Sequence, residues 1–312
     1  MVNQIRKFSR IVFSIFLLLP VVSPAAYAQD SPPADHEKTS QIVLFGSNSA
    51  YPFSGRTGPA LAVIVGDVPY LVDFGPGIVH QAETAADSGI TALRPAKLAR
   101  AFVTHLHSDN TAGYAELILL PWIKGRDSQL DVYGPPGLNM MTTHLTAAYE
   151  EDVNVRLAGE QANKEGYKVN VLEIEPEFEY SDENVKITAF AGHHGIWHFS
   201  YGYKFETPDR KIVISGDTAP TQDITKAADG CDVLVHEVYS EKMFASCSEE
   251  MQKYYRENHT SSYQLADLAN TSEPGLLILY NLPEGTDPED VLSEIAETYS
   301  GKVVVGKCLT VY

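Results

Sequence analysis

The chain has 312 residues, a formal net charge of −18 and three cysteines. This length can bury a large hydrophobic core and suits one domain of two halves better than two independent domains. So negative a surface repels polyphosphates, which argues against a nucleic-acid substrate or partner. Three cysteines permit at most one internal disulfide, and the sequence leaves open which pair would form it.

The N-terminal segment has the features of a secretory signal peptide. A basic start precedes an apolar stretch at residues 11–22, which is too short to span a bilayer stably, and Ala26-Tyr27-Ala28 matches an A-x-A cleavage site. A retained membrane anchor is the alternative, but two prolines break the segment. We therefore predict a cleaved signal peptide at residues 1–28.

The mature chain would be more acidic still and would begin with a polar segment. Cleavage removes three basic and no acidic residues, which leaves 284 residues with a net charge of −21. Residues 29–40 are polar and are predicted to form a flexible leader to a domain at residues 41–312. No further apolar run of membrane-spanning length follows. The sequence predicts a secreted protein, with the periplasm as its expected location and no stable membrane association after cleavage.

Short β-branched and aromatic segments, separated by Gly and Pro, predict a strand-rich first half. These strands are predicted at residues 41–46, 60–65, 70–74, 98–103 and 130–133. Apolar residues at helical spacing predict helices at residues 82–88, 111–120 and 138–150, and Pro121 is expected to stop the second of them. Residues 151–168 are charged and have no pattern strong enough to predict an element.

The segment Thr104-His105-Leu106-His107-Ser108-Asp109-Asn110 lies between the strand at residues 98–103 and the helix at residues 111–120. Neutral imidazoles and carboxylates are ligands that Zn²⁺ takes in hydrolytic sites. Because positions i and i+2 of an extended backbone point to the same side, both histidines can reach one ion. An exposed loop that is merely rich in histidine is the alternative that this segment alone leaves open.

The second half is predicted to contribute a sheet of its own. Its strands are predicted at residues 167–174, 185–190, 203–206, 211–215, 231–237, 276–280 and 302–305. The composition of residues 207–210 indicates a turn that joins the third and fourth of these strands into a hairpin. A helix is predicted at residues 287–298.

The histidine-rich segment resembles the T-H-x-H-x-D-H signature of the metallo-β-lactamase superfamily, and later segments are similar to its ribonuclease Z and arylsulfatase-like branches. The resemblance covers nearly all of residues 41–312. It implies an α+β fold, the four-layer αββα sandwich, and a metal-dependent hydrolase. The sequence departs from the signature at Asn110, where the family has its final histidine.

The resemblance also implies a set of metal ligands. His105 and His107 match the first two histidines of the signature, and His194 matches a histidine that the family supplies to the same metal. Asp217, in Ser-Gly-Asp-Thr, matches the carboxylate that bridges two ions, and Asp109 matches a ligand of the second ion. His193, next to His194, is left as either structural or functional. Asp73 matches a strand-end aspartate and is interpreted as a carboxylate that holds the metal loop in place.

The second metal site is altered. Where the family has its last metal histidine, after a buried strand, this chain has Asn281, so both histidines of that site are asparagines. The site keeps Asp109 and the shared Asp217, together with amide oxygens that are poor ligands for zinc but acceptable to harder ions. We therefore expect one tightly bound Zn²⁺ and a second site that is empty or weakly filled.

Two further residues are implied for catalysis. The strand that ends in His236-Glu237 is similar to a ribonuclease Z segment whose carboxylate orients a catalytic histidine on the following helix, and that histidine matches His259. His236 itself is interpreted as structural. We expect Asp109 to act as a base or to orient water, and His259 to donate a proton to the leaving group or stabilise its charge.

The predicted function is a secreted metal-dependent hydrolase acting on a small molecule by means of a metal-activated water. A phosphodiester, sulfate ester, lactone or β-lactam could each be the substrate, and the altered second site favours carbonyl chemistry slightly. The alternative is a pseudoenzyme, a binding protein that keeps the fold. Retention of His259 together with all three first-site histidines argues against it. The sequence leaves the substrate and the oligomeric state open.

Overall fold

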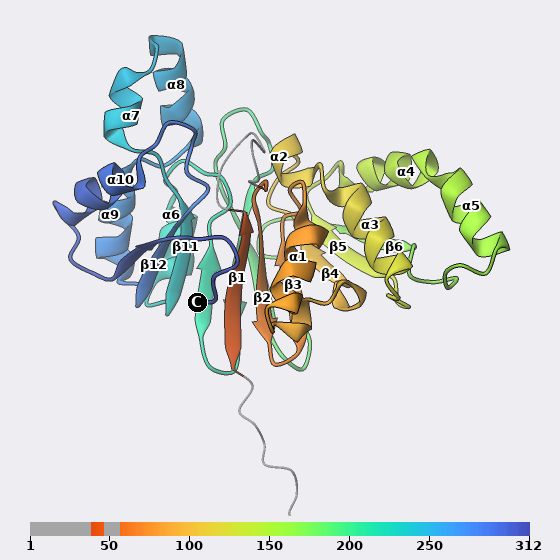
Figure 1. Ribbon diagram of the computed structural model, residues 1–312. Helices are drawn as coiled ribbons and strands as arrows, with labels where there is room; N and C mark the ends of the chain where they lie inside the picture. Colours follow the sequence, from red (N-terminus) through yellow and green to blue (C-terminus); the bar gives the residue numbers. More distant parts are fainter. Residues whose placement is uncertain (1–38, 47–56) are drawn as a thin grey trace, which may run out of the picture. The chain divides into compact units, whose positions relative to one another are not determined.

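The computed structural model describes residues 39–46 and 57–312. Within these residues the chain forms two β-sheets that pack face to face, with helices covering the outer face of each sheet (Figure 1). The predicted four-layer αββα arrangement is therefore confirmed. The predicted signal peptide at residues 1–28 lies outside the described residues, as does all but the end of the predicted leader, and the first strand begins at Ser40.

The first sheet has six strands, of which the first three form an antiparallel meander while the later pairs are parallel. In spatial order they are β1 (Ser40–Gly46), β2 (Ala60–Val65), β3 (Val68–Val72), β4 (Arg100–Phe102), β5 (Leu130–Gly134) and β6 (Val169–Glu173). The strand predicted at residues 167–174 is β6, which pairs with β5. Its predicted place in the second half is wrong, because a local apolar pattern carries no information about the sheet that a strand joins.

The second sheet has seven strands in the order β13-β12-β11-β10-β9-β8-β7. Their bounds are β7 (Glu179–Ser181), β8 (Lys186–Ala191), β9 (Tyr201–Glu206), β10 (Lys211–Ile214), β11 (Val233–Glu237), β12 (Leu276–Tyr280) and β13 (Val303–Val305). The pairs from β10 to β13 are parallel. The predicted hairpin is confirmed, because β9 and β10 pair antiparallel and the Thr207 N–H donates to the Arg210 carbonyl at 2.9 Å.

Three hydrophobic cores lie between the four layers. Strand β2 contributes side chains to two of them. Alternate residues of this strand face opposite sides. Leu61, Val63 and Val65 join the core between the sheets, whereas Ala60, Ala62 and Ile64 join the core beneath the helices. Because both faces are covered, all six residues of β2 are buried, and the strand is a continuous apolar run.

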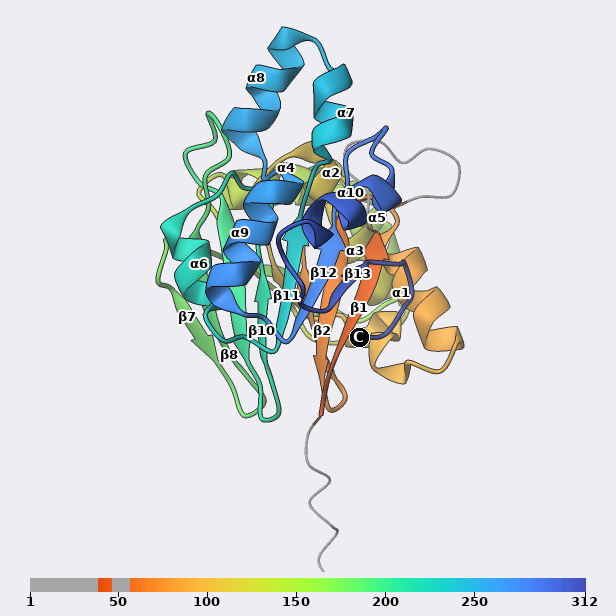
Figure 2. The same ribbon diagram turned by 90° about the vertical axis from the view of Figure 1, so that its left-hand side faces the viewer.

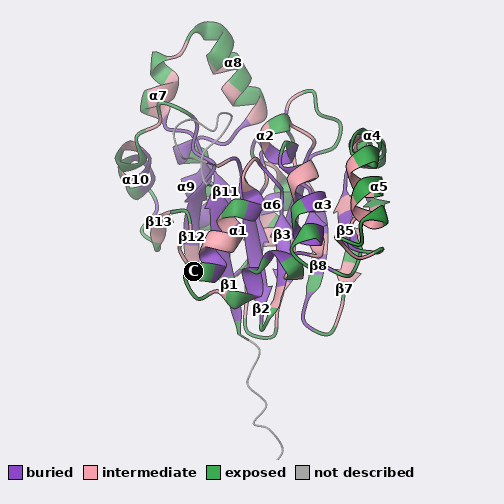
Figure 3. Ribbon diagram, turned by 45° about the vertical axis from the view of Figure 1, so that its right-hand side comes forward, coloured by how far each residue is buried: buried purple, intermediate pink, exposed green. Residues whose placement is uncertain are grey.

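The outer helices differ in how many of their residues are buried. The first sheet is covered by α1 (Ile78–Asp87), α3 (Tyr114–Ile123) and α4 (Leu138–Ala148), and the second by α6 (Gln222–Ala228), α9 (Ser262–Ser272) and α10 (Pro288–Ala296), as Figure 2 shows. By contrast α5 (Glu150–Ala158), α7 (Glu241–Ser246) and α8 (Glu249–Asn258) bury no residue (Figure 3). Helices α7 and α8 extend beyond the layers as a helical arm, called the α7–α8 arm below. Within the described part of the chain, no helix is long and apolar enough to cross a membrane.

Pro121 lies inside α3 and does not stop it, contrary to the prediction. A proline at this position has no N–H to donate to the carbonyl four residues earlier, that of Leu117. The Arg126 guanidinium takes the place of that donor, because its Nη1 donates to the Leu117 carbonyl at 3.0 Å. A buried side chain beyond the end of the helix therefore satisfies the acceptor that Pro121 would leave without a partner.

Arg126 is fully buried and carries a testable share of the stability. Its guanidinium also donates to the carbonyls of Leu98 at 2.8 Å, Ile118 at 2.7 Å and Gly166 at 2.8 Å. Burial lowers the pKa of Arg126 to about 10, so the side chain remains charged at neutral pH.

We expect Arg126→Met to lower the free energy of unfolding by about 3–5 kcal/mol, because several buried carbonyls lose their donor. Urea unfolding followed by circular dichroism measures this loss. Arg156→Met is the matched control: it removes a partly exposed i,i+4 ion pair with Asp152, worth roughly 0.5 kcal/mol. Equal losses for the two variants would show that the guanidinium of Arg126 does not hold these segments together.

Candidate metal centre

The candidate residues lie at one edge of the two sheets. His105 follows β4, His194 follows β8, and Asp217 follows β10, while Glu237 ends β11 and Asn281 follows β12. Strands β10, β11 and β12 are parallel, so their carboxyl ends meet at the same edge and bring their following loops together. The α7–α8 arm stands beside this edge (Figure 1).

Three imidazoles converge at this edge. The Nδ1 atom of His107 lies 2.8 Å from His105 Nε2 and 3.2 Å from His194 Nε2. Nitrogen ligands about 2.0–2.1 Å from a tetrahedral zinc ion are spaced roughly 3.3 Å apart. Three nitrogens at these distances form a donor set that fits zinc, and they are the three histidines that the sequence predicted.

The other ring nitrogens of His194 and His105 have partners that leave Nε2 free for a metal. By contrast, His107 Nε2 accepts from the Trp197 indole N–H at 2.7 Å, a contact that a neutral His107 must give up if its Nδ1 is to bind a metal. His194 Nδ1 lies 2.9 Å from the backbone carbonyl of Asn258, which can only accept, so Nδ1 carries the hydrogen and Nε2 keeps its lone pair for a metal. His105 Nδ1 lies 3.0 Å from the Thr104 hydroxyl. Burial lowers the pKa of all three histidines, which favours the neutral form that binds metal. His194 contributes a nitrogen to this cluster and His193 does not.

Asp73 holds the metal loop, as the sequence analysis predicted. Its carboxylate accepts from the Thr104 N–H at 2.8 Å and from the Thr104 hydroxyl at 2.9 Å, and also from Asn110 Nδ2 at 3.0 Å. Burial raises the pKa of Asp73 to about 7. Through Thr104 this carboxylate fixes the backbone on which His105 sits.

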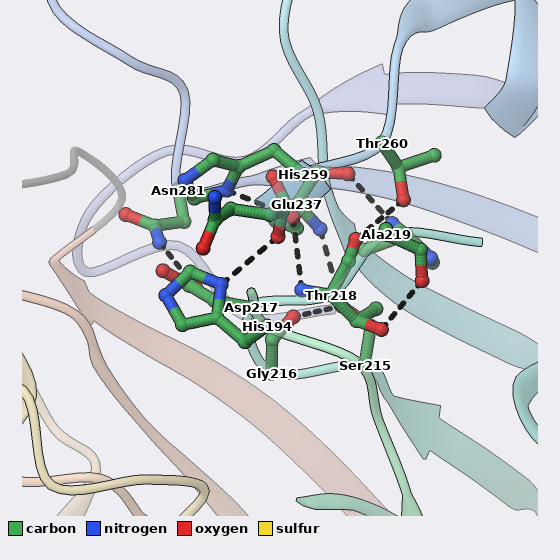
Figure 4. A network of polar contacts seen from close by, with 12 residues as sticks. His194, Ser215, Gly216, Asp217, Thr218, Ala219, Glu237, His259, Thr260 and Asn281 are labelled. Atoms are coloured by element: carbon green, nitrogen blue, oxygen red, sulfur yellow. Dashed lines mark hydrogen bonds and ion pairs between the residues drawn. The ribbon is translucent and has the colours of Figure 1, made fainter. Parts of the chain in front are cut away.

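Asp217 is the buried carboxylate of the site. It follows Gly216, whose positive φ of 62° and whose contact with the Tyr201 carbonyl leave no room for a Cβ. Its Oδ1 accepts from Asn281 Nδ2 at 2.7 Å (Figure 4). Burial and the charge of Glu237 raise the pKa of Asp217 to about 6. Asp217 forms a second close donor group with His194 and His259, all within 4.8 Å of one another.

Asp109 lies beside the three-histidine cluster rather than in it, and its predicted roles as a ligand of a second ion or as a water-orienting base stay predictions. It is half-buried and lines a cavity of about 410 Å³ together with Asp217, His259 and Asn281. In the described structure it belongs to neither of the two close donor groups. Its position suits a carboxylate that orients water or contacts a second ion better than a ligand shared with the three histidines.

Glu237 and His259 form a buried ion pair. His259 Nδ1 lies 3.0 Å from Glu237 Oε1, and Glu237 also accepts from the Thr218 N–H at 3.0 Å (Figure 4). Burial alone would lower the pKa of His259, but the adjacent Glu237 carboxylate outweighs it and raises the pKa to about 9. His259 is therefore protonated at neutral pH. The expected carboxylate–histidine contact is confirmed.

The sequence analysis placed His259 on the helix that follows the strand ending in Glu237. This prediction is wrong, because His259 lies between α8 and α9. It is the C-cap residue of α8, and α9 begins three residues later with Ser261 as its N-cap. A serine whose hydroxyl accepts from the Gln264 N–H starts the helix there, which leaves His259 in the connecting loop. His236, interpreted as structural, is buried in β11 with Nδ1 2.6 Å from the Glu237 carbonyl.

Tyr254 is a site residue that the sequence analysis missed. Its hydroxyl lies 3.3 Å from His259 Nε2, and its side chain lines both the 410 Å³ cavity and a neighbouring cavity of about 880 Å³. The larger cavity is also lined by His107, Trp197 and further residues of α8. Helix α8 is rich in charged residues and buries none, and the sequence analysis did not predict it, although Met251, Tyr254 and Tyr255 recur there at helical spacing.

The structure combines an αββα fold with a cluster of His and Asp side chains at the strand ends, as in proteins that bind a metal ion at the ends of their strands. Comparison with known proteins identifies the family. The beta-lactamase superfamily domain matches residues 69–280. The chain belongs to this superfamily, and proteins named ribonuclease Z are among the relatives that it resembles.

Individual relatives support this placement. The ribonuclease Z of Mycobacterium bovis (strain BCG / Pasteur 1173P2) is 27% identical over 275 residues, which cover 86% of this chain and 96% of that protein. The metallo-beta-lactamase fold protein YhfI from Bacillus subtilis has a TM-score of 0.66 at 17% identity, covering 88% of this chain and 99% of that one. Human tRNase Z, short form, has a TM-score of 0.64 at 20% identity, covering 87% and 98%.

Proposed function

We propose that the protein is a secreted hydrolase that uses one zinc ion, held by His105, His107 and His194, to cleave an ester-like, phosphodiester, lactone or β-lactam bond of a small molecule. The observation that carries the proposal is the convergence of three imidazole nitrogens, 2.8 and 3.2 Å apart, beside the buried Glu237–His259 pair. A zinc ion held by these residues would supply a Lewis acid and would lower the pKa of a water molecule toward about 7.

Side chains of the protein carry out the remaining steps of the proposed reaction. Asp217 and Asp109, which line the same cavity, orient the attacking water and accept its proton. His259, protonated at neutral pH, donates a proton to the leaving group. Glu237 holds the His259 ring and its charge, and the Tyr254 hydroxyl lies against the other ring nitrogen, where the ring meets the cavity.

A small-molecule substrate suits this site better than RNA, although the relatives are named ribonuclease Z. The chain carries a net charge of −18, and the larger cavity is lined by Glu250 and Glu257 as well as Lys253. These carboxylates disfavour the approach of a phosphate backbone. Secretion to the periplasm, without stable membrane association, rests on the signal-peptide features at residues 1–28.

A binding protein without catalysis is the second candidate, favoured by the two asparagines at positions 110 and 281. A panel of substrates separates the two. The mature protein, supplied with one equivalent of zinc, would be assayed on p-nitrophenyl acetate, bis-p-nitrophenyl phosphate, p-nitrophenyl sulfate, a lactone, a chromogenic cephalosporin and a short RNA. Turnover of a small substrate that a chelator abolishes supports the hydrolase. Tight zinc binding with no turnover on any substrate supports the binding protein.

A further inference from the structure

The larger cavity beside the three histidines has apolar walls that solvent reaches. Apart from His107, the residues that line its 880 Å³ come from α8 and from the loop around His194. The loop contributes Ile196, which is 97% exposed, and the exposed ring of Trp197, while α8 contributes the exposed ring of Tyr254. Large apolar side chains that are exposed together beside a cavity mark a surface that binds a ligand or a partner.

The loop and the helix are fastened to each other, so the cavity is part of the fold. The Gly195 N–H donates to the Glu257 carbonyl at 3.2 Å, and His194 Nδ1 donates to the Asn258 carbonyl at 2.9 Å. Gly195 has a positive φ of 56°, and a Cβ at this position would lie 2.0 Å from Asn258 Oδ1. The glycine therefore permits the close approach that sets the loop against α8.

The charges on the cavity wall are mainly negative. Glu250, Lys253, Tyr254 and Glu257 are spaced i, i+3, i+4 and i+7, so they share one face of α8. Lys253 pairs with Glu257, whose carboxylate lies 3.8 Å from its ammonium, whereas Glu250 forms no ion pair with any described residue. The net charge of −18 adds to the negative potential at this wall.

Aromatic rings beside a carboxylate without a counter-charge fit an organic cation. The faces of Trp and Tyr rings attract ammonium groups, and quaternary ammonium ligands are recognised in this way. Glu250 lies about 6 Å before Tyr254 along the helix axis, so a cation beside Glu250 stays apart from the protonated His259, which Tyr254 contacts. An anionic group would meet only Lys253, whose charge Glu257 already offsets.

We propose that the substrate of this site carries an ammonium group on an apolar or aromatic body, which the 880 Å³ cavity binds while the reacting bond lies at the metal centre. Trp197, Tyr254 and Glu250 determine this specificity. The inference rests on the proposed function only in treating the bound cation as part of a substrate, because binding of the cation needs no turnover.

The test measures the binding of three para-substituted phenols to the zinc-loaded mature protein. The first two, p-hydroxyphenyltrimethylammonium and p-tert-butylphenol, have the same shape and differ in charge, and p-hydroxybenzenesulfonate is an anion. Isothermal titration calorimetry should show the cation binding roughly tenfold more tightly than the neutral phenol, and the anion more weakly than both. Binding of the neutral phenol or the anion as tight as that of the cation would overturn the proposal, as would no binding of the cation at about 10 mM.

Binding and turnover can fail separately. The predicted order of affinities, found together with no hydrolysis of any substrate in the panel, would support the cation site and count against the proposed hydrolase alone. Hydrolysis of a panel substrate without the predicted order would support the hydrolase and overturn the cation site.

Variants locate the bound cation. Glu250→Gln keeps the size of the side chain and removes its charge, so it should weaken binding of the cation roughly threefold and leave that of the neutral phenol unchanged. Glu249→Gln is the matched control, because it removes the same charge from the same turn of α8 at a residue that does not line the cavity. Equal effects of the two variants would show that the cation does not bind beside Glu250.

Trp197→Leu tests the aromatic wall. It keeps an apolar side chain and removes the ring face, so it should weaken binding of the cation roughly fivefold and that of the neutral phenol less. Zinc content is measured in the same samples, because Trp197 contacts His107. An unchanged ratio of the two affinities in a variant that keeps its zinc would overturn the role of the ring.

Discussion

Replacing His194 with alanine is expected to abolish tight zinc binding and to reduce turnover to background. The Nε2 of His194 lies 3.2 Å from His107 Nδ1, and two imidazoles rarely hold zinc in a site that must also bind water. We expect the zinc affinity to fall by more than roughly 100-fold, the upper range for losing even an outer partner of a ligand. Zinc content after dialysis and turnover of the substrate identified by the panel measure both effects.

The neighbouring histidine gives a matched control. His193 lines the cavity of about 880 Å³ and is held through its backbone: its N–H donates to the Thr218 hydroxyl at 2.9 Å, and its carbonyl accepts from the Ala219 N–H at 2.8 Å. His193→Ala should therefore keep its zinc and most of its activity. If His194→Ala retained one zinc ion while His193→Ala lost it, the assignment of the third ligand would be wrong.

His259→Ala should leave the zinc content unchanged and lower turnover by roughly 10²–10⁴-fold, the usual effect of removing a positioned general acid. The pKa of His259 is raised to about 9 by Glu237, so the group is protonated below that pH and loses its proton as the pH rises through it. We therefore expect wild-type turnover to fall above about pH 9 and this decline to be absent in the variant.

The leaving group distinguishes a proton donor from a residue that only supports the fold. A general acid matters most for a poor leaving group, so the effect of His259→Ala should shrink for nitrophenyl esters and grow for alkyl esters. Tyr254→Phe retains the ion pair of His259 with Glu237 and loses only the hydroxyl 3.3 Å from Nε2, so its effect should be smaller. A loss by His259→Ala that is equal for all leaving groups would exclude the proton-donor role.

The strands were predictable because most of them are buried on both faces. The sequence predicted β2 and β12 with the bounds that the structure shows, since each is a short apolar run limited by turn residues. The prediction that Pro121 ends α3 was wrong, because the residue that compensates for the proline lies outside the helix. The donor that compensates for it, Arg126, comes from beyond the helix and shows no local pattern.

The sequence analysis did not predict helices α5, α7 and α8. These helices bury no residue, so they have no fully buried apolar face, although Met251, Tyr254 and Tyr255 of α8 recur at helical spacing. This gap affected the site, because α8 supplies Tyr254 and the Asn258 carbonyl that orients His194. The short strand β7 has only three residues, too few for a period of two to show.

The sequence predicted which residues form the site, but not how their side chains are arranged. Resemblance to the family gave the three histidines, Asp217 and His259, and the structure brings them together. The match to the family gave His194 as the ligand, but whether His193 joins it could not be predicted, because adjacent residues of the same type differ only in the direction of their side chains.

The central claim is that one zinc ion, bound by three histidines, supports hydrolysis. The most direct measurement is a titration of zinc into the metal-free mature protein, with bound zinc counted by mass spectrometry and hydrolysis followed in the same samples. We predict one tightly bound zinc ion per chain and activity that saturates at one equivalent. Two zinc ions of equal affinity, or activity that appears only with the second equivalent, would contradict the account.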